Sequence, residues 1–211
     1  WDGGRLLPPV LPGPGLLHEL ISWQNGDAPA LEFLGPEGSH PYAEKLWKAS
    51  YSQLKSCVDS LARELYAVLA NVPAGDYLTG NQPIIPVLLP QSPGLYISQL
   101  ATLEIGAAFC PINGDAPKER VKFICGDVGA KVVIAMRSDS ERVTWTKEDG
   151  TTVIWVDDYF TIPSSSSAEE EGSSAAKADE SSSKTSPVHD DGAAVAAKLR
   201  VANSTDLAYI M

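Results

Sequence analysis

An alternation of short apolar runs and helical patterns between residues 84 and 156 constrains the fold of this chain more than any other feature. Strand-like apolar runs lie at 84–89, 107–112, 132–134 and 153–156. The first two runs are each followed by a helical pattern that begins at a proline, a residue favoured in the first turn of a helix. Strands joined by helical crossovers pair in parallel, and the crossovers are right-handed. The segment therefore predicts an α/β fold with a mainly parallel sheet flanked by helices.

The residues before this alternation show two more helical patterns and one strand-like run. The stronger helical pattern spans 51–70, where Ser50 or Ser52 is placed to cap the first turn. Its apolar stripe repeats at helical spacing and consists of Leu54, Val58, Leu61, Leu65, Val68 and Leu69. A second helix is expected within 16–23 and a short strand at 30–34. Both would belong to the same α/β unit.

Composition divides the chain into four segments. Residues 1–15 are rich in proline and glycine and predict an extended lead-in, and residues 16–162 carry the α/β pattern. Residues 163–204 are rich in serine and acidic residues without an apolar period, so they predict a disordered insertion. Residues 205–211 return to a strand-like pattern. The insertion is interpreted as a tolerated surface loop, with a phosphorylated regulatory arm as the alternative.

Charge and composition exclude several classes of function. The formal net charge is −11 at pH 7 and the isoelectric point is about 4.6. So acidic a chain repels phosphate backbones, which argues against nucleic acid as a partner. No apolar stretch reaches the roughly 20 residues that a membrane-spanning helix needs. The three cysteines are widely spaced, which favours a reducing, cytoplasmic location over a disulfide framework.

The two ends predict that the chain is a piece of a longer protein. It begins at Trp1 with no initiator methionine, basic region or signal-type apolar core. It closes on 207–211, an apolar run with no turn or cap after it. A domain that stopped there would leave a sheet edge unfinished.

The sequence carries no complete catalytic, metal or phosphate motif. His18 and Glu19 begin a zinc-protease pattern, but Ser22 stands where the second histidine is required. No histidine lies at ligand spacing from a cysteine, and neither glycine-rich phosphate pattern occurs. Gly106 is interpreted as the residue that ends a helix. The thiols are interpreted as buried and structural: Cys57, Cys110 and Cys125. No catalytic or metal-binding residue is therefore predicted, and cofactor-binding residues stay unknown.

Four stretches, in order, resemble the adenylation domains of nonribosomal peptide synthetases. The strongest is 103–113, Leu-Glu-Ile-Gly-Ala-Ala-Phe-Cys-Pro-Ile-Asn, which is similar to the second core motif of that family. Residues 16–21 and 27–31 are similar to the opening helix and strand of the family. Residues 51–54 are similar to its first core motif, and residues 205–211 are similar to the strand before its phosphate loop. The departures from the family pattern are Ser50, Gln53, Glu104, Ile105, Phe109 and Asn113.

This resemblance implies that the chain is the N-terminal part of the large domain of an adenylate-forming enzyme. Such domains use ATP and Mg²⁺ to convert an amino acid into its adenylate. They then load the acyl group onto the phosphopantetheine thiol of a carrier domain, and a condensation domain of the same synthetase is a further implied partner. The resemblance also implies that 205–211 leads into the phosphate-binding loop, so the catalytic motifs follow Met211. Gly106, Pro111 and Pro117 match the family motif, and their implied roles are structural.

Two other functions stay open. One, implied by the same resemblance, is an acyl-coenzyme A ligase of the same superfamily, and the other is a non-catalytic interaction module that works through the serine-rich insertion. The long insertion is typical of eukaryotic chains, and large fungal siderophore synthetases are the expected setting. The amino acid that is activated is not readable, because the specificity positions of the family are absent from these residues.

Overall fold

The structure is a computed structural model of the 211-residue chain. It describes residues 16–21, 23, 26–35, 46–70, 72–73, 77, 82–160 and 206–210. The expected lead-in at 1–15 and the expected insertion at 163–204 lie outside the described residues.

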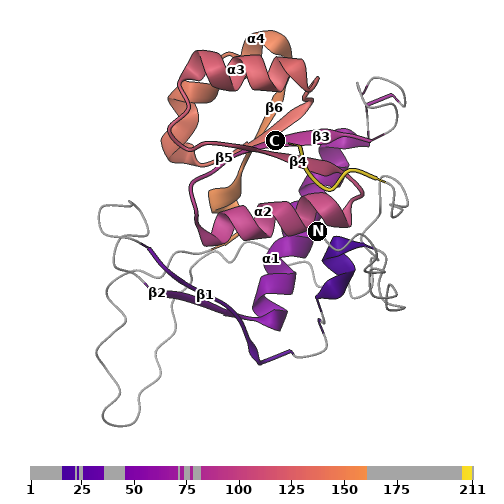
Figure 1. Ribbon diagram of the computed structural model, residues 1–211, viewed down its shortest axis with the longest axis vertical. Helices are drawn as coiled ribbons and strands as arrows, with labels where there is room; N and C mark the ends of the chain where they lie inside the picture. Colours follow the sequence, from indigo (N-terminus) through magenta and orange to yellow (C-terminus); the bar gives the residue numbers. More distant parts are fainter. Residues whose placement is uncertain are drawn as a thin grey trace, which may run out of the picture.

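A four-stranded parallel sheet forms the centre of the molecule (Figure 1). Its strands are β3 (Ile84–Leu88), β4 (Ala108–Ile112), β5 (Val132–Ala135) and β6 (Thr152–Trp155), in the order β4-β3-β5-β6. All three neighbouring pairs are parallel, for example Ile85 beside Phe109 and Ile134 beside Ile154. The four strands and the α/β fold class expected from the sequence are therefore confirmed.

Helices cover both faces of this sheet (Figure 1). On one face lie α1 (Tyr51–Leu69) and α2 (Pro93–Glu104), and on the other lie α3 (Lys118–Asp127) and the short α4 (Thr146–Asp149). Alternate residues of β5 serve the two cores, because Val132 and Ile134 pack with α1 and α2 while Val133 and Ala135 pack with α3. Helices bury both faces of the sheet, which is why the strands are continuous apolar runs in the sequence.

Local signals in the sequence explain where the long helices begin and end. Ser50 and Gln53 form a reciprocal capping box at the start of α1, and Ser92 caps α2 just before Pro93. At the end of α2, Gly106 has φ of 83° and donates its N–H to the Leu103 carbonyl at 3.0 Å. Gly106 therefore ends the helix in the left-handed conformation, as expected from the sequence.

Other elements differ from the sequence-based expectation. Leu17–Leu20 form only a short 3₁₀ helix (η1), so the helix expected across 16–23 is wrong in extent. Its N-terminal residue makes no side-chain capping hydrogen bond, and a single turn without a cap does not propagate. The strand β2 (Leu46–Ser50) was not expected, and it pairs antiparallel with β1 (Pro29–Leu34). The 3₁₀ helix η3 (Arg137–Val143) and α4 were also not expected.

None of the helices that the structure describes combines the length and the apolar character needed to cross a bilayer.

Candidate functional site

The carboxyl edge of the parallel sheet is where an α/β fold of this topology places a ligand. The chain leaves β3 toward α2 on one face and leaves β4 toward α3 on the other, so the topology switches between these neighbouring strands. The two loops touch at this point, because a Cβ atom on Gly114 would lie 3.6 Å from the Cα atom of Pro90. The switch point therefore lies between the end of β3 and the end of β4.

Residues 206–210 extend the sheet beyond β4 toward the same edge. The N–H of Phe109 donates to the Ala208 carbonyl at 3.1 Å, and the N–H of Ile210 donates to the Phe109 carbonyl at 3.0 Å. This is a parallel bridge between Phe109 and Tyr209, so the segment runs in the direction of β4. Within the described residues 206–210 the structure records this one bridge, and the strand expected at 205–211 extends beyond them.

A pocket of about 330 Å³ opens beside the end of β4 and this added segment. Its charged side chains are Arg120 and Asp127 of α3, and the Arg120 guanidinium lies 5.5 Å from the ring centre of the exposed Phe123. The other lining residues are apolar or neutral: Cys110, Pro111, Ile112, Asn113, Ala116, Ile124, Val128 and Ile210. The described wall offers one cation and one carboxylate on a largely apolar surface.

Two other arginines near this edge are engaged in holding the fold. Arg142 of η3 donates to the carbonyls of Gly114 and Ala116, the second at 3.1 Å, and pairs with Asp139. Arg137 pairs with Asp158 at 2.6 Å. Arg142 thus fixes the loop that follows β4, and Arg137 ties the end of β5 to the residues after β6.

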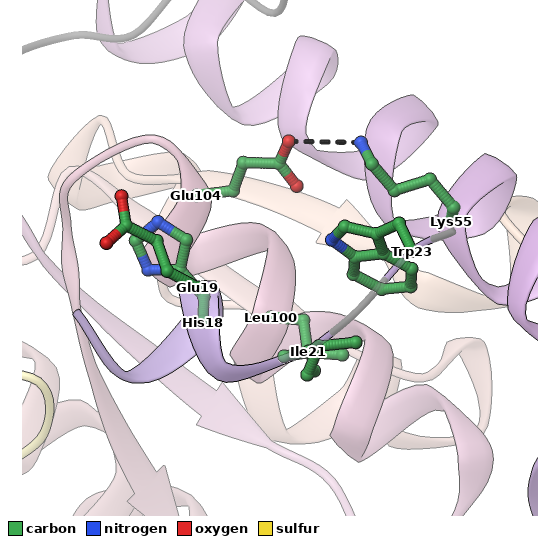
Figure 2. A pocket seen from close by; sticks show the side chains of 7 residues that line it. All are labelled: His18, Glu19, Ile21, Trp23, Lys55, Leu100 and Glu104. Atoms are coloured by element: carbon green, nitrogen blue, oxygen red, sulfur yellow. Dashed lines mark hydrogen bonds and ion pairs between the residues drawn. The ribbon is translucent and has the colours of Figure 1, made fainter. Parts of the chain in front are cut away.

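The second pocket, of about 290 Å³, lies where η1, α1 and α2 meet (Figure 2). Lys55 of α1 pairs with Asp59 and, at 3.2 Å, with Glu104 of α2, and its ammonium lies 5.6 Å from the centre of the Trp23 ring. Burial lowers the pKa of Lys55, but the two carboxylates outweigh it and raise the pKa above its ordinary value. Lys55 is therefore a cation at neutral pH and joins two helices rather than serving as a base.

The residues singled out from the sequence do not converge on a catalytic centre. His18 and Glu19 line the second pocket, and Ser22 lies outside the described residues. Within the part of the chain that the structure describes, no three metal-ligating side chains come together. Pro111 lines the first pocket, and Pro117 precedes α3 as its capping residue.

All three thiols are free, and none is activated as a nucleophile. Cys110 and Cys125 are buried as expected, whereas Cys57 is only half-buried. Burial raises the pKa of Cys57 and Cys110 above the ordinary value, and burial together with the neighbouring Cys110 raises that of Cys125 to about 12. A thiol that keeps its proton is a poor nucleophile and a poor metal ligand.

The described residues do not fit a triphosphate by themselves. Phosphate groups are held by successive backbone N–H groups of a glycine-rich loop with a nearby lysine, and the edge near β4 presents neither. No reaction step is therefore derived through ATP at these residues.

Sequence reasoning missed one contact that holds residues 206–210 against the sheet. The buried side chain of Gln82 contacts Leu207 through two hydrogen bonds. No motif includes Gln82, and its partner lies 125 positions away, so only the folded chain shows the pair.

The chain is similar in sequence to a known family and to curated proteins. The family described as AMP-binding enzyme matches residues 23–211. Nonribosomal peptide synthetase sidC of Arthroderma benhamiae is 46% identical over 127 residues, which cover 60% of this chain and 2% of that protein. Nonribosomal peptide synthetase SIDC of Beauveria bassiana is 40% identical over 153 residues, covering 72% of this chain and 3% of that protein. Among solved structures, MatB from Rhodopseudomonas palustris aligns with 51% of this chain and 20% of that chain, at 19% identity and a TM-score of 0.42.

The chain belongs to the family of AMP-binding enzymes. This confirms the resemblance that the ordered sequence motifs indicated. The chain spans about 2–3% of the length of the curated relatives it matches.

Proposed function

We propose that the chain is the first part of an adenylation domain that activates an amino acid, or a modified amino acid, with ATP. The observation that carries the proposal is the family match across residues 23–211, together with relatives at 40–46% identity that are named nonribosomal peptide synthetases. The parallel bridge between Phe109 and Tyr209 supports it. It directs the segment that resembles the strand before the phosphate loop toward the carboxyl edge of the sheet.

In this proposal the described residues build the support and the following residues carry the chemistry. The carboxylate must attack the α-phosphorus of ATP in line with the departing pyrophosphate, and Mg²⁺ neutralises the charge that develops. The described residues contribute the rigid edge at β4, held by Arg142, against which the phosphate loop is positioned.

The downstream partners follow from the same proposal. The acyl group passes to the phosphopantetheine thiol of a carrier domain, and a condensation domain of the same synthetase uses the loaded acid. The setting is a cytoplasmic, multidomain fungal synthetase, and a siderophore is the proposed product. The substrate is an amino-acid-like small molecule, which is compatible with the acidic chain because no polyanion must be gripped.

Thioester loading tests the proposal. The natural longer protein that contains this chain is incubated with ATP, Mg²⁺ and amino acids, including N-hydroxylated and N-acylated ornithines. Its own carrier domain is supplied with phosphopantetheine, and thioester formation is followed by intact-protein mass spectrometry. The proposal expects an amino-acid-dependent mass increase on the carrier domain. Transfer to free coenzyme A with fatty or aromatic acids would contradict it.

A further inference from the structure

The side-chain amide of Gln82 forms two reciprocal hydrogen bonds with the backbone of Leu207. Its Nε2 donates to the Leu207 carbonyl at 2.8 Å, and the Leu207 N–H donates to its Oε1 at 3.2 Å. The same Nε2 lies 3.4 Å from the carbonyl of Gly106, at the turn that leads into β4. Gln82 is 7% exposed, so its side of these part-buried bonds is shielded from water.

This geometry makes the Gln82 side chain a substitute for a strand residue. A glutamine amide carries the same donor and acceptor as a peptide group, and a pair of opposite hydrogen bonds is what one residue of a sheet offers its neighbour. The bonds between Phe109 and residues 208 and 210 follow directly along the segment. The segment is therefore held at two successive levels: Gln82 binds the backbone of Leu207, and Phe109 of β4 then binds the backbones of Ala208 and Ile210.

The two levels together fix the register of residues 206–210. A shift by one residue would remove Leu207 from Gln82 and would turn Tyr209 away from the Phe109 ring. Ala208 and Ile210 pack against core clusters, whereas Leu207 is 46% exposed and Tyr209 is 49% exposed. The register of the segment therefore depends on these hydrogen bonds together with the packing of Ala208 and Ile210.

We propose that Gln82 is a positioning residue for ATP binding. It sets how far residues 206–210 reach along β4, and so sets where the phosphate-binding loop begins. This inference rests on the proposed function, since it assumes that such a loop follows the segment. Gln82 itself lies just before the amino end of β3, at the opposite end of the strand from the carboxyl edge.

Hydrogen exchange in the natural longer protein tests the positioning directly. Gln82→Met keeps the length of the side chain but removes both hydrogen bonds to Leu207 and the longer one to Gly106. Leu207→Pro removes the donated N–H from the other side and leaves β3 untouched. Both variants should speed amide exchange in peptides that cover 206–210 by roughly tenfold, with peptides of β3 and β5 unchanged. Gln99→Met, in α2, is the matched control and should leave all these peptides unchanged.

Kinetics separate positioning from a general loss of structure. Both variants should raise the KM for ATP by about three- to tenfold, with the KM for the amino acid unchanged. The double variant should add little to Gln82→Met, because Gln82→Met already removes the hydrogen bond that Leu207→Pro removes. Unchanged exchange at 206–210 in the two variants, or equal increases in both KM values, would overturn the inference. If the wild-type protein adenylates no acid, the proposed function fails, whereas the exchange rates still show whether Gln82 holds the segment.

Discussion

The rings of Phe109 and Tyr209 stack, with their centres 5.8 Å apart and their planes 22° from parallel. The backbones of the same two residues form the bridge that adds the segment 206–210 to the sheet. One contact between rings and one between backbones thus join β4 to a part of the chain that lies 100 positions later.

Replacing Tyr209 by serine should lower the free energy of unfolding by about 1 kcal/mol, because the stacked pair is lost. Urea denaturation followed by fluorescence measures the change. Leu207→Ser is the control, since this residue of the same segment is exposed to a similar extent, 46% against 49%, and should cost less than about 0.5 kcal/mol. Equal losses in the two variants would show that the stack contributes nothing.

Replacing Gly106 by valine should destabilise the protein without affecting the affinity for ATP. The residue has φ of 83°, a conformation in which a β-branched side chain is strained by about 1–3 kcal/mol. Gly126→Ala is the matched control. Gly126 lies within α3, and a Cβ there meets nothing within 4 Å, so alanine should stabilise by about 0.5–1 kcal/mol. Unchanged stability of Gly106→Val with a strongly raised KM for ATP would make Gly106 a site residue.

Cys125 should react with iodoacetamide only as fast as the protein unfolds, because its pKa of about 12 leaves almost no thiolate at pH 8.

The raised pKa of Cys125 also makes the stability of the protein depend on pH. The folded state favours the protonated thiol, so this contribution is fully present below the ordinary pKa of 9.0 and is lost as pH rises from 9 to 12. Urea denaturation of the wild type and Cys125→Ala at pH 8 and pH 10.5 measures it. The wild type should lose more stability, and parallel losses would contradict the account.

Residues 164–198 should be dispensable for folding. Each halving of a flexible loop changes its closure free energy by only about 0.6 kcal/mol, so a short Gly/Ser linker should leave Tm nearly unchanged. Differential scanning calorimetry of the longer protein with and without the replacement makes the comparison. A fall of many degrees would show that the insertion packs on the folded part and would favour a regulatory arm.

The long helices α1, α2 and α3 and the parallel strands were predictable because their signals are local. Ser50, Ser92 and Gly106 mark helix ends by their own chemistry, and the buried strands read as apolar runs between turns. The ordered motifs then identified the family. Because short crossovers between parallel strands are right-handed, few arrangements of the strands in the sheet are possible.

The missed elements depend on partners that are distant in sequence. Strand β2 alternates exposed and buried residues over five positions, which is too short a pattern to stand out before its pairing with β1 is known. The expected helix at 16–23 had apolar spacing but no capping residue at its start. The link between Gln82 and Leu207 joins two residues with no pattern at all, and only folding brings them together.

ATP–pyrophosphate exchange tests the central claim most directly. The assay compares residues 1–211 alone with the natural longer protein, using ATP, Mg²⁺ and a panel of amino acids that includes modified ornithines. We expect amino-acid-dependent exchange in the longer protein and none above background in residues 1–211, because no described residue forms a phosphate cradle. A folded longer protein that exchanges pyrophosphate with no amino acid, or exchange by residues 1–211 alone, would contradict the account.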